Sequence, residues 1–155
     1  MYKDIFNFEN IRKPIVFEKL VKTLAREIGG QISTDRLAKI LDTNKATIER
    51  YIALLEQAFI IKRLYSFSRN LTKELKKSYK VYFLDIGLRN ILADDVVPPN
   101  KRADNGKIFE NFFIMERIKQ MQNNGRYPSF YFWRTYDKDE VDLIELVDGG
   151  INAFE

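Results

Sequence analysis

The first half of the chain spaces its apolar residues as an α-helix does, three times in succession. Gly29-Gly30 ends the first predicted helix, Ser33 or Thr34 caps a short second one, and Asn44 caps the third. The expected buried faces of the three helices are Phe17, Leu20, Val21, Leu24 and Ile28; Leu37, Ile40 and Leu41; and Ile48, Ile52, Leu55 and Phe59.

The pattern then changes to that of two strands. Residues 59–67 and 79–85 are rich in β-branched and aromatic side chains, and the polar, basic residues 68–78 separate them. Three helices with a three-residue turn between the last two, followed by a hairpin, predict a winged helix-turn-helix over residues 15–92. Residues 94–105 contain a double proline and are the best candidate for a linker.

The second half predicts one long helix and a small sheet. The helix runs from 105 or 106 to about 122, and strands are expected at 129–134, 140–147 and from 151 onward. The helix carries too many apolar residues for a thin stripe, so it is expected to be well buried. These residues are Ile108, Phe109, Phe112, Phe113, Met115, Ile118 and Met121.

Composition narrows the possible chemistry. The chain of 155 residues has no cysteine and no histidine, which excludes disulfides, thiolate ligands and histidine proton shuttles. Any catalysis must use carboxylates, Lys, Tyr, Ser or Thr, and carboxylates favour Mg²⁺ or Mn²⁺. No apolar run is long enough to span a membrane and the N-terminus lacks a signal-peptide pattern, so a cytoplasmic location is expected.

Charge is unevenly distributed and suggests a nucleic-acid partner. Residues 62–80 carry seven basic side chains and one acidic one, whereas residues 106–155 carry six basic and nine acidic ones. The third helix could enter the major groove of DNA while the wing contacts phosphate. The candidate nucleic-acid-binding residues are Lys45 and Arg50 on the third helix, and Arg69, Lys73, Lys76 and Lys77 in the hairpin tip.

Two alternatives compete with DNA binding. The basic block could be an ordinary solvated hairpin, and the module could dock a protein or another part of its own chain. The mixed charge of the third helix favours docking, because Glu49 and Glu56 accompany Lys45 and Arg50.

Three carboxylates in the second half form the candidate metal site. Glu110 lies in the first turn of the long helix, Asp142 on a strand and Glu155 on the next strand. Each has an ordinary explanation, such as helix-dipole complementarity for Glu110 and a solvated strand face for Glu140 and Asp142. Their order, however, is that of the PD-(D/E)xK nuclease core, in which an Asp and a later Glu hold a magnesium-type ion.

The whole array resembles the C-terminal region of a family of prokaryotic AAA-type ATPases. The matching residues are 44–56, 59–61, 80–88, 106–111, 133–135 and 140–142. In that family a P-loop domain precedes a winged helix and a restriction-endonuclease-like domain. The resemblance implies an α+β fold, with a winged helix-turn-helix over 15–92 and a truncated nuclease-like α/β core over 104–155.

The same resemblance implies that the longer protein is an ATPase and a metal-dependent nuclease. It implies Mg²⁺ or Mn²⁺ at Glu110, Asp142 and Glu155, and ATP only in an N-terminal domain. This chain has no phosphate-binding loop, and it ends before the lysine expected two residues after Glu155. It is therefore expected to be an inactive piece whose partners are DNA and its own ATPase domain.

The sequence thus supports a DNA-associated regulatory region as the first hypothesis. The alternatives are a non-catalytic interaction or docking module, and a transcription regulator that acts through the winged helix alone. The sequence leaves the oligomeric state open.

Overall fold

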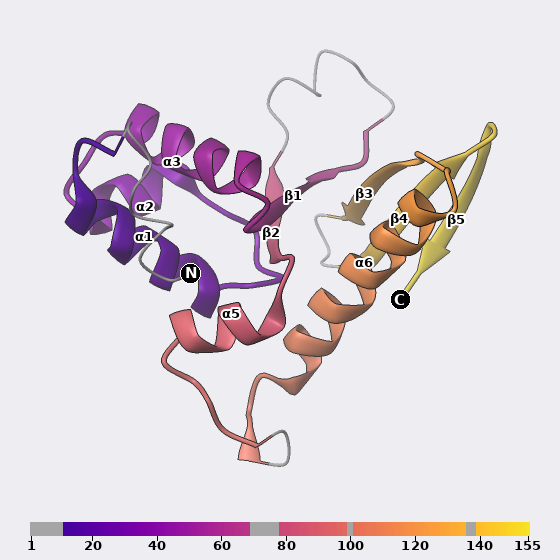
Figure 1. Cartoon of the computed structure of the whole chain (residues 1–155). Coiled ribbons are helices and arrows are strands. Elements are labelled where there is room, and N and C mark those ends of the chain that lie inside the picture. Colours follow the sequence, from indigo (N-terminus) through magenta and orange to yellow (C-terminus); the bar gives the residue numbers. More distant parts are fainter. Residues whose placement is uncertain (1–10, 69–77, 99–100, 136–138) are drawn as a thin grey trace.

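The computed structural model describes residues 11–68, 78–98, 101–135 and 139–155. Across these residues the chain forms five helices and one mixed five-stranded sheet, an α+β arrangement (Figure 1). The helices are α1 (Pro14–Arg26), α2 (Thr34–Ile40), α3 (Lys45–Gln57), α5 (Ile86–Leu92) and α6 (Asn105–Asn123); the strands are β1 (Ile61–Ser66), β2 (Tyr79–Phe83), β3 (Ser129–Arg134), β4 (Glu140–Val147) and β5 (Gly150–Phe154).

One sheet joins the two halves of the chain. Its strand order is β2-β1-β3-β4-β5. Neighbouring strands are antiparallel except β1 and β3, which pair in parallel through Tyr65 with Tyr131 and Ser66 with Phe132. We call residues 11–98 the N-terminal segment and residues 101–155 the C-terminal segment. The domain boundary expected between them stays a prediction, and strands from both segments share the sheet.

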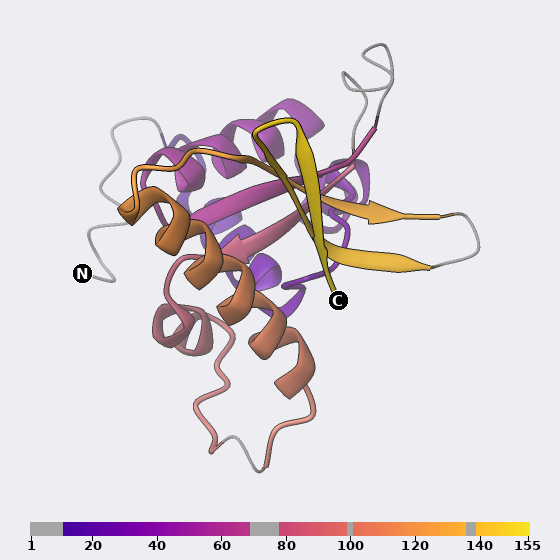
Figure 2. The same ribbon diagram turned by 90° about the vertical axis from the view of Figure 1, so that its right-hand side faces the viewer.

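The β1–β2 hairpin lies between two layers of helix. Helices α1, α2 and α3 pack on one side, and α6 crosses the other side (Figure 2). Because successive side chains of a strand point to opposite faces, β2 contributes side chains to the core on both sides of the hairpin. Tyr79, Val81 and Phe83 pack with the first three helices, whereas Tyr82 packs with α6. All five residues of β2 are buried.

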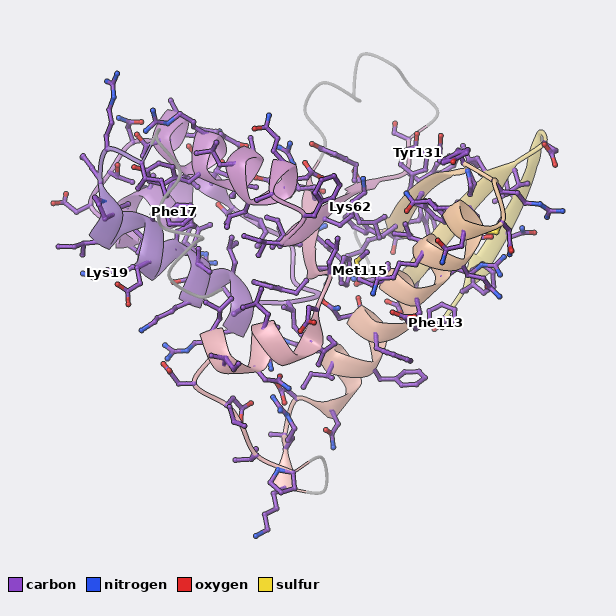
Figure 3. All side chains as sticks on the ribbon, in the orientation of Figure 1. Phe17, Lys19, Lys62, Phe113, Met115 and Tyr131 are labelled. Carbon is purple, nitrogen blue, oxygen red and sulfur yellow. The ribbon has the colours of Figure 1, made fainter. Side chains whose placement is uncertain are left out.

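The helix starts agree with the capping residues expected from sequence. The Ser33 hydroxyl accepts a hydrogen bond from the Arg36 amide, and the Asn44 side chain accepts one from the Thr47 amide at 2.8 Å. Within the N-terminal segment, Phe17 is fully buried (Figure 3). Lys19, two residues along, points away from this helical layer (Figure 3).

Four of the expected core positions were wrong. Phe59 is 79% exposed, because α3 ends at Gln57 and Phe59 takes a left-handed backbone with φ of 56°. Ile40 is 60% exposed, since Leu37, Ala38 and Leu41 already cover the buried side of α2. Phe109 and Phe112 are also exposed, because they lie outside the face of α6 that packs on the sheet through Ile114, Met115 and Ile118.

Ion pairs hold the connection between α5 and α6. The buried Arg89 guanidinium lies 2.8 Å from Asp104, and Arg102 lies 2.6 Å from Asp95 and 3.0 Å from Asp104. Burial alone would raise the pKa of Asp104, but hydrogen bonds from Arg102 and Arg89 outweigh it and lower that pKa. Near its two ends, the described part of the predicted linker is therefore held by ion pairs of Asp95 and Asp104.

Candidate functional site

A buried lysine stands at the centre of the predicted carboxylate site. Lys80 of β2 is only 2% exposed. Its ammonium lies 3.0 Å from Glu110 Oε1, contacts Glu140 directly, and lies 3.8 Å from Asp142 Oδ1. We call Lys80, Glu110, Glu140 and Asp142 the lysine cage. The cage joins a strand of the N-terminal segment to a helix and a strand of the C-terminal segment.

Glu110 is held from several directions. Its Oε1 also accepts a 2.6 Å hydrogen bond from the Tyr82 hydroxyl. Its Oε2 lies against Gly29, where a Cβ atom would approach to 3.0 Å; the φ of +70° at Gly29 also favours glycine. One turn of α6 thus meets both β2 and the end of α1 through a single carboxylate.

The next residue of α6 completes this contact. The Asn111 side chain is fully buried. It accepts a hydrogen bond from the Phe83 amide and donates one to the Phe83 carbonyl, both at 2.8 Å. Because β2 is an edge strand, its outer backbone groups need such partners.

The charges in the cage shift three pKa values. Burial would lower the pKa of Lys80, but hydrogen bonds and charge from Glu140 and Glu110 outweigh it and raise that pKa. Burial and the Glu110 charge raise the pKa of Tyr82 above its usual value. Burial, followed by the Glu110 charge, raises the pKa of Asp142, and Lys80 only partly opposes this. The surroundings of Asp142 therefore disfavour its charged form.

The three predicted metal ligands do share one cavity. Glu110, Asp142 and Glu155 line a hollow of about 440 Å³ together with Phe109, Phe113 and Phe154. As arranged, however, these residues do not fit a divalent ion. Lys80 already supplies a positive charge at Glu110 and Asp142, and among the described residues no three acidic side chains are placed to hold a metal. The metal assignment stays a prediction.

The second candidate surface is the solvent side of α3. Arg50 is exposed and its guanidinium lies 5.1 Å from the centre of the Tyr51 ring. Lys45 is also exposed, and it pairs with Asp35 at 2.9 Å, which raises the Lys45 pKa. The other four predicted nucleic-acid residues, Arg69, Lys73, Lys76 and Lys77, lie outside the described residues.

The acidic residues of α3 turn toward the hairpin. Glu56 accepts a 2.7 Å hydrogen bond from Arg63 Nε and another from the Arg63 amide at 3.0 Å. Glu49 accepts a hydrogen bond from the Tyr79 hydroxyl at 3.3 Å and lies 3.9 Å from Arg63. Burial and the Glu49 charge raise the pKa of Tyr79, so that hydroxyl keeps its proton. Arg63 therefore offsets the charge of Glu56, while Glu49 faces the hairpin and bonds the neutral Tyr79 hydroxyl.

Sequence reasoning missed three basic residues at these sites. Arg12 and Lys13 line a hollow of about 420 Å³ beside Arg50, and the Lys13 amide donates to the Tyr51 hydroxyl at 3.0 Å. The short segment before the first helix gave no periodic signal that could have placed them. Lys80 could have been found: it is the one charged residue in the run Tyr79–Phe83, and a buried lysine needs acidic partners.

These features define an α+β protein in which a β-hairpin separates a three-helix layer from a long helix and a carboxylate cavity. The chain belongs to the family of a domain of unknown function (DUF8612), whose model matches residues 1–96. A second domain of unknown function (DUF4143), found in proteins associated with AAA-type ATPases, matches residues 105–155.

Two curated relatives match nearly the whole chain. They are uncharacterised proteins of Mycobacterium bovis and Mycobacterium tuberculosis, each 28% identical over 148 residues. The match covers 94% of this chain but 33% of each relative, so the chain spans about a third of their length. No solved structure matches. In the part of the chain that the structure describes, no helix is long and apolar enough to cross a membrane.

Proposed function

We propose that this chain is the DNA-contacting regulatory region of a longer AAA-type ATPase, with the N-terminal segment acting as a winged helix. The observation that carries the proposal is the inward turn of Glu49 and Glu56, which bind Arg63 and Tyr79. Because Arg63 offsets Glu56 and both carboxylates are directed toward the hairpin, the solvent side of α3 can present Arg50 to an anionic partner.

The exposed face of α3 suits a DNA groove. Ala46, Arg50, Ala53 and Gln57 follow one another at helical spacing on the exposed or half-exposed side. Alanines allow a helix to approach base edges closely, while Arg and Gln side chains can hydrogen-bond bases. Arg12 and Lys13, beside the start of α3, are suitably placed to contact phosphate.

In this proposal the C-terminal segment has a regulatory role, and we assign no cleavage step to it. Lys80 neutralises part of the carboxylate cluster, so no metal-assisted step is derived from it. Nuclease activity and bound Mg²⁺ or Mn²⁺ stay predictions for the longer protein, as does ATP binding in a further domain. The resemblance to AAA-type ATPases and the threefold greater length of the relatives support the idea of such a protein.

Fluorescence anisotropy with a labelled duplex tests the proposal. Wild-type protein should bind with an affinity that falls steeply as salt rises, because binding releases counterions from phosphate. Arg50→Ala should weaken binding by about tenfold, which corresponds to about 1.4 kcal/mol within the usual range for a base contact. Arg126→Ala is the matched control, because Arg126 is exposed and lies just beyond the end of α6. Equal affinities of the two variants would contradict the proposal.

A docking module is the second candidate. The exposed Phe109 and the half-exposed Phe113 line the carboxylate cavity, which gives α6 an apolar surface beside acidic groups. If the chain binds no duplex even at low salt, the basic surface of α3 would have to meet an acidic protein surface instead. Co-purification with the ATPase domain of the same longer protein, lost on Arg50→Ala, would then support docking.

A further inference from the structure

The carboxylate cluster already contains a cation that belongs to the chain itself. Two of the three carboxylates come within 3.0 Å of the Lys80 ammonium or closer, and the third lies at 3.8 Å. Carboxylate oxygens are the ligands that hard divalent ions prefer, but with the ammonium among them these three side chains are not arranged to hold a metal. The Lys80 ammonium also lies 5.4 Å from the centre of the Phe132 ring, whose face favours a cation.

The position of Lys80 is fixed by the sheet and cannot easily change. Its strand pairs with β1 on one edge, with Leu64 as the partner of Lys80. The other edge of β2 is partly occupied, by the Gln31 bridge to Lys80 and by the Asn111 side chain on Phe83. Only 3% of its side chain is exposed, so the ammonium faces the carboxylates and not solvent.

The cage as a whole keeps an excess of negative charge. Its three carboxylates outnumber the single ammonium; Arg134 contacts the edge of the cage, with its Nε 3.5 Å from Glu140. Like charges held close together repel unless a proton or cation lies between them. Lys80 is therefore the group that allows α6 and β4 to bring their acidic residues together.

We infer that Lys80 occupies the place that a divalent metal would take among Glu110, Glu140 and Asp142, and that it fastens the N-terminal segment to the C-terminal segment. In this chain the cluster is an internal salt-bridge junction. It would become a cation site only when the ammonium is removed. This inference is independent of DNA binding by α3, so either can fail without the other.

A titration with Mn²⁺, followed by NMR on the 155-residue chain, tests the inference. Mn²⁺ broadens the amide signals of residues close to it, so it reports where it binds. Wild-type protein should show no saturable broadening around Glu110 and Asp142 in the millimolar range. Lys80→Met, which removes the charge but keeps a long side chain, should bind Mn²⁺ at this place at least about tenfold more tightly.

Two further variants make the result specific. Lys62→Met removes an exposed lysine from the neighbouring strand β1 and should leave Mn²⁺ binding unchanged. Lys80→Met combined with Asp142→Asn should lose most of the gained binding. Lys80→Arg, which retains a positive charge, should not gain Mn²⁺ binding, and it serves as the comparison if Lys80→Met folds poorly.

The contradicting outcomes are equally definite. Saturable Mn²⁺ broadening around Asp142 in wild-type protein would show that Lys80 does not exclude a metal. A folded Lys80→Met variant with no gain in binding would show that the carboxylates do not form a cation site. A gain of binding in Lys80→Arg as large as in Lys80→Met would show that the positive charge is not what excludes the metal.

Discussion

Helices α3 and α6 lie on opposite sides of the same hairpin, and each directs acidic residues toward it. On the α3 side, Glu49 and Glu56 bind Arg63 and Tyr79. On the α6 side, Glu110 binds Lys80 and Tyr82. Each side of the hairpin thus supplies one cation and one tyrosine hydroxyl.

The outcome differs because the remaining charges differ. Around α3 the outward residues include Arg50, with Arg12 and Lys13 nearby, so the exposed surface is basic. Around α6, strand β4 adds Glu140 and Asp142 to Glu110, so a single buried cation leaves an acidic cavity. The charge of a surface thus depends on which charged side chains are paired inside the fold. A count of charged residues along the sequence does not show this.

The largest expected effect comes from removing the cation on the α6 side. Lys80→Met leaves three carboxylates without their buried partner, and breaking a buried pair costs about 3–5 kcal/mol. For a chain of this size the melting temperature should fall by roughly 6–20 °C. Thermal unfolding followed by circular dichroism measures this fall in melting temperature. A smaller fall for Lys80→Met than for Lys62→Met would contradict the claim that Lys80 stabilises the carboxylate cluster.

The corresponding change on the α3 side should cost less. Arg63 is 20% exposed and Glu56 is 25% exposed, so solvent screens their attraction in part. Arg63→Met also removes the stacking of the guanidinium on Tyr65 and Tyr79. We expect a loss of about 1–2 kcal/mol in urea unfolding.

The same variant should weaken DNA binding, because it leaves the charge of Glu56 unneutralised on α3. Adding Glu56→Gln to Arg63→Met should restore most of the affinity without restoring the salt bridge. If the double variant binds DNA no better than Arg63→Met, internal neutralisation is not what makes the surface of α3 basic.

The smallest effect is expected at Asp142, and it should have the opposite sign. Burial and Glu110 raise its pKa, so the folded state binds a proton more readily than the unfolded state does. The stability from this proton is present below the unfolded pKa of about 3.9 and is lost as the pH rises through the folded pKa. Asp142→Asn should therefore stabilise the protein slightly near neutral pH, by about 0.5 kcal/mol at most, since the side chain is 35% exposed.

Unfolding of wild type and Asp142→Asn from pH 4 to pH 7 checks this sign. The advantage of the variant should grow with pH and vanish in acid. Glu140→Gln is the matched control, because Glu140 makes the closest contact with Lys80 and its loss should destabilise. An Asp142→Asn variant less stable than wild type at neutral pH would contradict the raised pKa of Asp142.

Much of the local structure could be predicted from the sequence. The faces of α1 and α3 follow periodicity, and Asn44 caps α3 as its residue type suggests. Errors arose where tertiary contacts decide: Phe59 follows the end of a helix, and Phe109 lies on a side of α6 that stays exposed among the described residues. Periodicity shows which residues share a face, but it does not show which faces find a partner.

The candidate site was partly predictable for the same reason. Glu110, Asp142 and Glu155 do line one cavity, as their order along the chain suggested. Lys80 comes from the other half of the chain, and only the parallel pairing of β1 with β3 brings the two halves into one sheet. Such a long-range pairing leaves little trace in local pattern, although the isolated lysine in an apolar strand was a usable sign.

The most direct test of the central claim, that α3 is the DNA-contacting surface, is an amide NMR titration of the chain with a short duplex. The account predicts that the signals that shift most come from Arg12, Lys13 and the exposed side of α3 around Arg50 and Gln57. Glu110 and Asp142 should change little in the same titration. Shifts concentrated around the carboxylate cavity, with α3 unchanged, would contradict the account.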